Sequence, residues 1–424
     1  MMMNCPSTPQ RIHLLAIART LLYAGLFMVS LLVIRIGGEI TVGDVLLIGA
    51  FLVTAADVAL NGRPIKFGNG GVAAFALLFV GGVLTSFVAA NPSGSATVAA
   101  RVALLAFLIP WAMTVLLDTR RRLATGLSFL AAGAATCGAG SIVQLLVGDI
   151  IPGSQTTTGG RFPGFAVHVS DTGGVVCLAV VYGAGLLFSR GTVRRLAGVL
   201  SLALGLVGLI LSGSVSGMIA AVVGIFALLI WHRLHLGKIL ALGALMVAGA
   251  SWAISAMAVQ DNALTPVERI KQATGLTGGD AGLNTSATRW ESIVAGWEGF
   301  IQNLFLGAGL EPAAAVTAVD LPAHNFFVAA LYQGGMIFTL GLVITLVRLV
   351  WRGLRSAWQR GVPAAAAAGM VTALVFAMTA PSFFNRYFWL PIALAAVAYQ
   401  VERTQTRPVR RSSVAASTAP ALVG

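Results

Sequence analysis

Residues 71–90 have the sequence GVAAFALLFVGGVLTSFVAA, which contains no charged residue and is long enough to cross a bilayer as one helix. Similar apolar stretches recur along the whole chain. Of the 424 residues, 57% are hydrophobic and 10% are charged, whereas a soluble domain has about 25% charged residues. We therefore predict an all-α, polytopic membrane protein and exclude a water-soluble fold.

The apolar stretches predict about twelve transmembrane helices. They lie at about 14–34, 41–60, 71–90, 97–117, 123–147, 172–189, 196–212, 214–231, 238–258, 324–347, 362–380 and 387–400. Two of the connections, at about 148–171 and 259–323, are long, and long ordered loops often carry function. The predicted organisation is one transmembrane unit over residues 1–400, followed by a disordered cytoplasmic tail at 401–424.

The basic residues indicate the orientation of the chain. With twelve helices and a cytoplasmic N-terminus, 19 of the 27 Lys and Arg residues fall in cytoplasmic connections, and the C-terminus is cytoplasmic as well. The net charge of +13 therefore reflects membrane topology, and no nucleic-acid partner is expected. Seven basic residues remain outside or at the outer border, where each is either a solvated loop residue or a functional one. They are Arg35, Arg101, Arg161, Arg269, Lys271, Arg289 and Arg386.

The loop at 259–323 contains two helix signals. Residues 265–268 (TPVE) form a capping box with proline at the first helical position. Residues 288–291 (TRWE) form a second capping box, followed by apolar residues at helical spacing as far as Leu304. We predict an amphipathic helix that begins at Thr288 and lies on the membrane surface or against the helical bundle.

A histidine stands at the end of this loop, directly before the tenth apolar segment, in residues 321–325 (LPAHN). A helix start favours the neutral imidazole, which can accept a proton from a hydroxyl, so His324 is a candidate general base. Alternatively, His324 and Asn325 only cap the helix at the membrane interface. The spacing alone does not separate these two interpretations.

Two external arginines are candidates for binding an anion. Arg289 occupies the predicted first turn of the amphipathic helix, where its guanidinium and free backbone amides would converge on a phosphate. Arg161 stands in a glycine-rich turn, residues 159–165 (GGRFPGF), whose backbone can approach an anion closely. Alternatively, Arg289 is a solvated residue beside Glu291, and the turn around Arg161 is a plain surface loop. Two arginines and one histidine on this face suit a diphosphate-bearing lipid and an acceptor hydroxyl, and the sequence shows no zinc-type ligand cluster or phosphate-binding P-loop.

The stretch HNFFVAALYQGG at residues 324–335 resembles the motif of the bacterial O-antigen ligase and polysaccharide polymerase family, in which His-Asn is followed at a fixed distance by glycine. Arg161, Arg289 and the GAG sequence at 307–309 stand at corresponding places, and the resemblance covers about residues 140–340. It implies a metal-independent glycosyltransferase without a cofactor. Such an enzyme takes glycan from undecaprenyl diphosphate on the periplasmic side of the bacterial inner membrane.

The resemblance also implies roles for individual residues. Arg161 and Arg289 would bind the diphosphate, His324 would act at the acceptor hydroxyl, and Asn325 and Thr288 would support them. The acceptor would be lipid A-core in a ligase or a growing polysaccharide in a polymerase, and the motifs do not distinguish these.

Two other classes of function stay open at this stage. A transporter or lipid flippase predicts ionisable residues near the bilayer midplane, of which the predicted segments hold few. A non-catalytic assembly scaffold would leave the external arginines and the histidine without a role.

Overall fold

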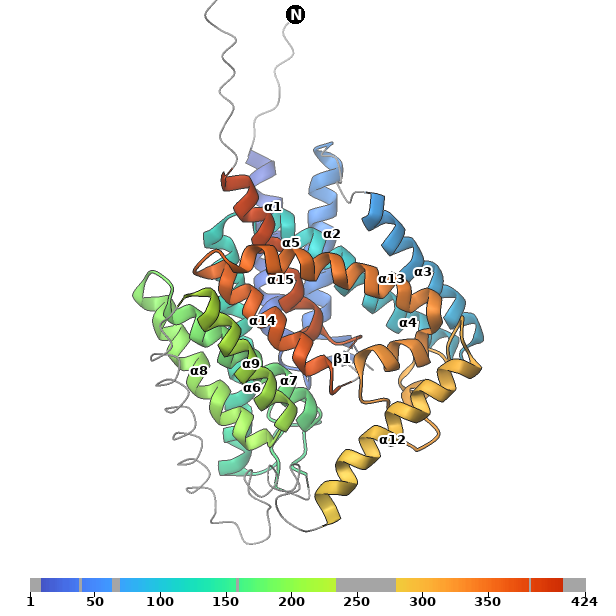
Figure 1. Cartoon of the computed structure of the whole chain (residues 1–424). Helices are drawn as coiled ribbons and strands as arrows, with labels where there is room; N and C mark the ends of the chain where they lie inside the picture. Colours follow the sequence, from blue (N-terminus) through green and yellow to red (C-terminus); the bar gives the residue numbers. More distant parts are fainter. Residues whose placement is uncertain are drawn as a thin grey trace, which may run out of the picture.

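The computed structural model describes residues 9–37, 40–62, 69–157, 160–233, 280–380 and 383–406, and its fold is almost entirely helical (Figure 1). The α-helices are α1 (Pro9–Met28), α2 (Val42–Leu60), α3 (Asn69–Val88), α4 (Pro92–Ala103), α5 (Ile109–Leu116), α6 (Arg120–Val147), α7 (Val169–Leu187), α8 (Thr192–Ser212), α9 (Val215–Trp231), α12 (Asp280–Gln302), α13 (Phe326–Ala357), α14 (Val362–Ala377) and α15 (Arg386–Thr406). A π-helix η1 (Leu104–Leu108), a 3-10 helix η2 (Pro312–Ala315) and an antiparallel ribbon of β1 (Arg35–Gly37) and β2 (Ile40–Thr41) complete the description. The hydropathy pattern did not reveal the ribbon.

The chain is a polytopic membrane protein, because seven of the described helices are long and apolar enough to cross a bilayer. These are α2, α3, the continuous rod α4–η1–α5, α6, α7, α8 and α13, while α1, α9 and α14 contain shorter apolar stretches. Helices α2 and α9 begin and end within one residue of the predicted positions. The predicted segment at 238–258 and the capping box at 265–268 lie outside the described residues.

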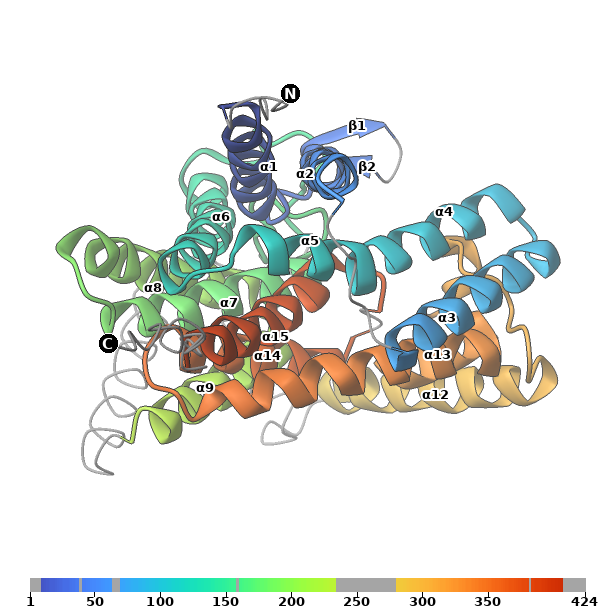
Figure 2. The ribbon, with the colours of Figure 1, turned by 90° about the horizontal axis from the view of Figure 1, so that it is seen from above.

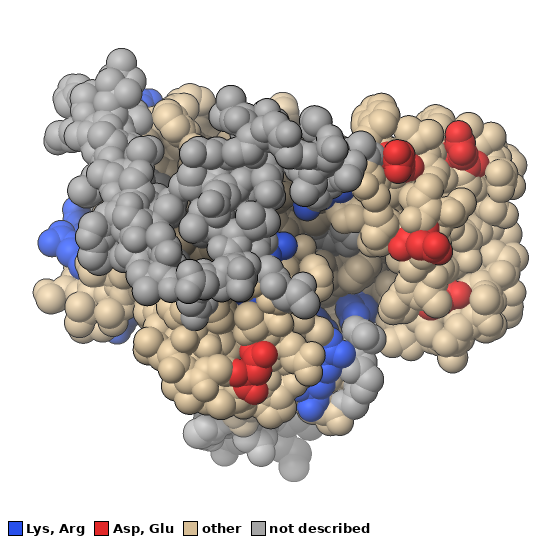
Figure 3. Space-filling model, turned by 90° about the horizontal axis from the view of Figure 1, so that it is seen from below, with Lys and Arg blue, Asp and Glu red and all other residues tan. Residues whose placement is uncertain are grey.

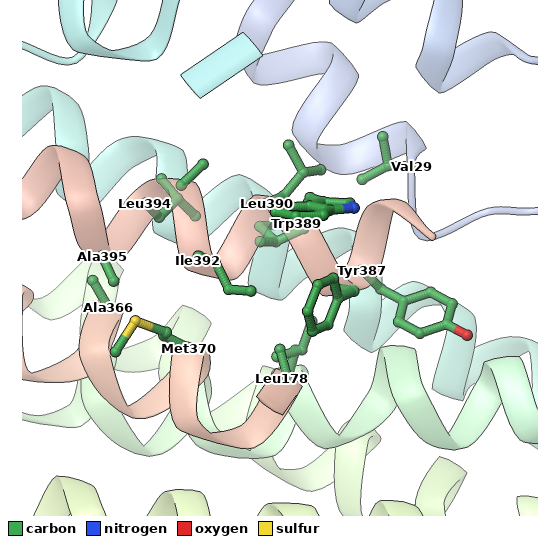
Figure 4. Close-up of a cluster of buried hydrophobic side chains, with 14 of the residues drawn as sticks. Val29, Leu178, Ala366, Met370, Tyr387, Trp389, Leu390, Ile392, Leu394 and Ala395 are labelled. Atoms are coloured by element: carbon green, nitrogen blue, oxygen red, sulfur yellow. The ribbon is translucent and has the colours of Figure 1, made fainter. Parts of the chain in front are cut away.

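Helix α15 forms the centre of the hydrophobic core. All of its residues from 386 to 398 are buried, because α5, α7, α13 and α14 pack around it. Figure 4 shows Trp389 and Ile392 of α15 among side chains of the neighbouring helices, including Leu178 of α7 and Met370 of α14. The indole N–H of Trp389 donates a hydrogen bond of 2.6 Å to the carbonyl of Phe383, so this buried ring leaves no polar atom unpaired.

Helices α3, α13 and α12 lie next to one another on one flank of the molecule (Figure 2). The backbones of α3 and α13 come very close together, because a Cβ atom on Gly81 would lie 2.5 Å from the backbone nitrogen of Phe338. The ring of Phe338 is fully buried in this contact. This flank therefore gives α13 a rigid support.

The predicted straight segment at 97–117 contains a π-helical turn. Pro110 has no N–H to donate to the carbonyl of Ala106, and in the preceding turn the N–H of Ile109 donates to the carbonyl of Leu104. The rod nevertheless continues across this turn from Pro92 to Leu116.

Helix α15 extends to Thr406, six residues past the predicted boundary at 400. Glu402 is buried in this extension and forms an ion pair with Arg120 at the start of α6. This pair fixes the last turns of α15, which carry too many polar residues to be assigned to a membrane segment from hydropathy. Residues 407–424, the rest of the predicted tail, lie outside the described residues.

The opposite end of α15 is held by a second ion pair. Arg386 and Asp44 of α2 are both buried and pair through two hydrogen bonds. The carboxylate of Asp44 also accepts a hydrogen bond of 2.9 Å from the backbone N–H of Thr41, which completes a capping box at the start of α2. One of the seven basic residues predicted to be external is therefore bound to a buried carboxylate.

Candidate active site

Helix α12 carries two of the predicted site residues, but the prediction that it begins at Thr288 is wrong. The helix starts at Asp280, so Thr288 and Arg289 lie inside it. A Thr-x-x-Glu pattern marks a helix start only where the preceding residues are not helical. Here residues 280–287 already belong to the helix. The backbone amides at Arg289 are therefore engaged in the helix, and this residue can contact a ligand only through its exposed side chain.

One face of α12 packs closely on the start of α13. A Cβ atom on Gly296 would lie 2.9 Å from the Cβ of Ala323, and one on Gly299 would lie 2.5 Å from the ring of Tyr332. The predicted single apolar stripe is divided, because large apolar side chains also cover the opposite, solvent-accessible face. These exposed residues are Trp290, Val294, Trp297 and Ile301. Helix α12 thus lies against the bundle and also presents an apolar surface outward.

Helix α13 is interrupted at Gly335, where φ is 65° and ψ is −175°. The interruption frees backbone groups that pair with the segment following α12. The N–H of Ala308 donates to the carbonyl of Tyr332 (2.9 Å), that of Gly309 to Gln333 (3.0 Å) and that of Met336 to Leu304 (2.9 Å). We call these two paired segments, residues 304–309 and 332–336, the clasp. It fixes the end of α12 to the first half of α13.

The clasp explains why both of its segments contain glycine. Gly307 has a φ of 71°, and a Cβ atom there would lie 2.5 Å from the carbonyl carbon of Gln333. A Cβ atom on Gly335 would lie 2.5 Å from the carbonyl carbon of Phe305. The GAG sequence at 307–309 and the GG that ends the HNFFVAALYQGG motif therefore meet in space, where only glycine fits without strain.

His324 contacts Ser292 of α12 across the junction that the clasp secures. The Nδ1 atom of His324 lies 3.2 Å from the hydroxyl oxygen of Ser292, which is fully buried. The hydroxyl of Ser292 donates a hydrogen bond of 2.8 Å to the carbonyl of Arg289, so its oxygen is left to accept a hydrogen bond from the ring N–H. In this arrangement Nδ1 carries the proton, and Nε2 is the nitrogen that can accept one from a substrate.

The pKa of His324 is lowered from its ordinary value. Burial of the ring has the largest effect, the positive charge of Arg289 adds to it, and a backbone hydrogen bond at Pro322 partly opposes it. This direction favours the neutral imidazole, through burial and a nearby cation, and the role of His324 as a general base stays a prediction. Since a cation acts on the ring, Arg289 and His324 share one local environment.

Asn325 performs the capping role that the sequence left open for both residues. Its side-chain oxygen accepts hydrogen bonds from the backbone N–H groups of Phe327 (3.0 Å) and Val328 (3.2 Å), which makes it the N-cap of α13. Its amide nitrogen donates to the carbonyl of Met378 at 3.3 Å. His324 precedes the cap, and its ring points to Ser292 instead of the first turn of α13.

Arg161 lies on a neighbouring element. Its Nε donates a hydrogen bond of 2.7 Å to the carbonyl of Ser212, at the turn between α8 and α9. The glycine-rich turn is packed against α6, because the N–H of Gly164 donates to the side-chain oxygen of Gln144 at 2.6 Å. That amide is not open to an anion as predicted. The structure thus joins Arg289 and His324 through Ser292 and holds Arg161 separately, so the part that Arg161 plays in one site stays a prediction.

Further arginines gather at the same end of the molecule. Arg386 and Arg101 act electrostatically on Asp44, and Arg386 and Arg35 act on Asp171 at the start of α7. On the face seen from below, several Lys and Arg side chains lie beside a hollow, and acidic side chains lie on the surfaces around it (Figure 3). This end of the protein therefore favours an anionic ligand.

Sequence reasoning missed Ser292 and the network around Asp171. A serine within a helix is too common to attract notice, and only the fold places Ser292 against His324. Asp171 accepts a hydrogen bond of 2.9 Å from the hydroxyl of Tyr387, whose hydroxyl in turn accepts one of 2.6 Å from Asn385. The signal available for Asp171 was its place beside His168 at the end of a long external loop.

Comparison with known families shows that residues 199–343 match the O-antigen ligase family. This range contains most of α8, all of α9 and α12, and the clasp, and so includes Arg289, Ser292, His324 and Asn325, while Arg161 precedes it. The resemblance noted in the sequence is confirmed for these residues. Members of the family are membrane glycosyltransferases of the ligase or polymerase type. A comparison with curated proteins finds no match to the chain.

Proposed function

Because residues 199–343 form an O-antigen ligase family domain, we propose that this protein transfers a glycan from undecaprenyl diphosphate to an acceptor hydroxyl at the periplasmic face of the bacterial inner membrane. The observation that carries the proposal is the contact between His324 and the buried Ser292, with Arg289 acting on the same imidazole. His324 as the base for the acceptor and Arg289 as the cation for the leaving group then lie in one region.

In the proposed reaction, Nε2 of His324 accepts the proton of the acceptor hydroxyl. The hydroxyl oxygen forms a bond to the anomeric carbon of the donor sugar. The bond from that carbon to the diphosphate oxygen breaks, and its electron pair stays with the diphosphate. Arg289 stabilises the negative charge that the leaving group gains, and the imidazolium then releases its proton to water. The products are the transferred glycan and undecaprenyl diphosphate.

The charge of Arg289 has two effects in this scheme. Its positive charge helps to lower the pKa of His324, which favours the neutral ring that can accept a proton. When a diphosphate binds, its negative charge compensates the guanidinium, and the imidazole becomes more basic as the donor arrives. Donor binding and base strength are therefore coupled through one arginine.

Three other residues support this pair in the proposal. Asn325 caps α13 and so fixes the position of His324 at its start. Thr288 lies one helical turn before Ser292 on α12, beside Arg289. Arg161 is the second cation for the diphosphate, held by the carbonyl of Ser212. The proposal needs no metal ion or cofactor.

We propose the topology that the basic residues predict, with twelve spans and both termini in the cytoplasm. The site then opens to the periplasm, where lipid-linked glycans and their acceptors meet. The acceptor is lipid A-core or a growing polysaccharide chain, and both present the hydroxyl that the base requires.

Transfer by purified protein in proteoliposomes, with lipid-linked repeat units as donor, tests the proposal. His324→Ala and Arg289→Ala should each lower the rate on the order of a hundredfold or more. His232→Ala is the matched control. His232 follows the last residue of α9, where its ring stacks on Phe188, and this variant should keep the parental rate. Parental rates in both site variants would contradict the proposed roles.

The same assay distinguishes the candidate reactions. Chain growth without lipid A-core means polymerase, and transfer only when lipid A-core is present means ligase. Movement of the donor across the membrane without a new glycosidic bond would support a flippase and refute glycan transfer.

A further inference from the structure

A cavity of about 80 Å³ lies at the end of the molecule opposite the candidate active site. Its walls come from the start of α3, the π-helical turn with α5, the second half of α13 and the second half of α15. One buried water needs about 10–15 Å³ on this measure, so the space would hold several waters or one compact polar group. The proposed glycan transfer does not use this cavity.

Two arginines of α13 line the cavity, one helical turn apart. Arg348 and Arg352 are both half-buried, and each acts on the other as a like charge. Arg403 acts on Arg352 as a further like charge, and the phenol of Tyr399 acts in the opposite direction. The ion pairs of Arg120, Arg122 and Arg386 with carboxylates show how arginines are compensated elsewhere, and neither arginine of the cavity takes part in them. Half-buried like charges of this kind are costly unless an anion compensates them.

The backbone around the arginines is arranged to receive an anion. A guanidinium nitrogen of Arg348 lies close to the place that a Cβ atom on Gly70 would take, so the arginine reaches the backbone of the first turn of α3. Gly70 and Gly71 lie in the first turn of α3, a helix of 20 residues whose first amides have no partner within the helix. Gly71 lines the cavity together with the two guanidinium groups. Forked guanidinium donors and helix amides are the groups that bind phosphate.

The general excess of basic residues at this end of the helices does not by itself explain why Arg348 and Arg352 line a cavity. Arg355 of the same helix shows the ordinary arrangement, since its guanidinium lies 4.7 Å from the ring of the exposed Trp351 on the outer face. Arg348 and Arg352 instead face inward. Trp351 and Trp358 are 57% and 60% exposed, as is typical of aromatic residues at the level of lipid headgroups.

We propose that this cavity binds the headgroup phosphate of an anionic phospholipid from the cytoplasmic leaflet. The phosphate lies between Arg348, Arg352 and the start of α3. The apolar walls, which include Ala106 and Ala393, meet the glycerol end of the lipid, and the acyl chains lie outside because the cavity is too small for them. A basic pocket between transmembrane helices at the cytoplasmic side is the type of site that such lipids occupy.

The test uses full-length protein purified in neutral detergent and titrated separately with phosphatidylglycerol, phosphatidylcholine and inorganic phosphate. Bound lipid is counted by native mass spectrometry, and thermal unfolding is followed in parallel. We expect retention of phosphatidylglycerol and a raised unfolding temperature, with little effect of the other two. Arg348→Gln with Arg352→Gln should weaken phosphatidylglycerol binding by about tenfold or more. Arg355→Gln, which removes an outward-facing charge from the same helix end, should bind like the parent.

A second variant keeps the test decisive if the double substitution unfolds. Ala106→Leu fills the cavity without changing its charge and should also weaken binding. The proposal is overturned if both variants bind phosphatidylglycerol like the parent, or if phosphatidylcholine binds equally well. Equal stabilisation by inorganic phosphate would overturn the lipid as ligand and identify a free-phosphate site.

Discussion

Replacing Gly335 with alanine should disconnect the two helices that hold the proposed site. Gly335 occupies a backbone region that is essentially restricted to glycine, and a residue forced into it costs about 1–3 kcal/mol. The new Cβ atom would also lie 2.5 Å from the carbonyl carbon of Phe305, so the two segments of the clasp have to move apart. A cost of ~3 kcal/mol shifts the equilibrium for closing the clasp about a hundredfold. Because Ser292 lies on α12 and His324 precedes α13, their contact is lost with it.

The assay is glycan transfer by purified protein, measured together with thermal unfolding in detergent. Gly335→Ala should lower kcat on the order of a hundredfold, since a displacement of about 1 Å at a catalytic group has an effect of that size. Gly62→Ala is the control, because Gly62 also has a positive φ, of 58°, but a Cβ atom there has nothing within 4 Å. A Gly335→Ala protein that keeps the parental kcat would refute the argument that the clasp positions the site.

Three further predictions follow from contacts of the site and the core. Arg289→Gln should raise the pKa of His324, because the nearby cation is removed, so the acidic limb of the pH–rate profile should move to higher pH. Ser292→Ala should lower kcat by about tenfold with little change in KM, because the hydrogen bond that orients the ring is lost. Asp44→Asn should destabilise the protein by about 3–5 kcal/mol in detergent unfolding, because it leaves the buried Arg386 without its counter-charge.

The predictions for Ser292 and Asp44 each have a matched control. Ser128→Ala removes a hydroxyl that donates to the carbonyl of Ala124 within α6, far from the site, and should leave kcat unchanged. Asp118→Asn breaks an exposed ion pair with Arg122 and should change stability by less than about 1 kcal/mol. If Arg289→Gln leaves the pH–rate profile unchanged, Arg289 does not influence the pKa of His324. If Asp44→Asn and Asp118→Asn destabilise the protein equally, burial does not make the Asp44–Arg386 pair more important than an exposed one.

The sequence predicted the helices best where hydropathy alone determines them. Helix α2 was placed within one residue, because its apolar run is bounded by a capping Thr41 and by Asn61. Helix α12 was placed too late, because a capping-box pattern at Thr288 also fits the interior of a helix that starts at Asp280. The ends of α15 depend on Arg386 and Glu402, whose partners are far away in the sequence and leave no local pattern.

The candidate site was only partly predicted, because its contacts also join residues that are far apart in the sequence. His324 and Arg289 were identified by their place on the external side, and the fold brings them together. Ser292 was missed because its importance arises from a contact with a residue 32 positions away. The glycine-rich turn around Arg161 left an anion site and a plain surface loop open, and the structure shows that Gly164 of this turn packs on α6. Patterns of residue type indicate chemistry, whereas only tertiary contacts assign each residue its partner.

The exposed apolar side of α12 links the reaction to the thickness of the bilayer. Trp290 and Trp297 on this side favour immersion in the boundary between headgroups and acyl chains, while Ser292 on the other side sets the height of His324. A thicker or thinner membrane changes the immersion that is most favourable for the helix, at a modest cost per ångström. Acyl-chain length should therefore tune turnover in liposomes without any change to the protein.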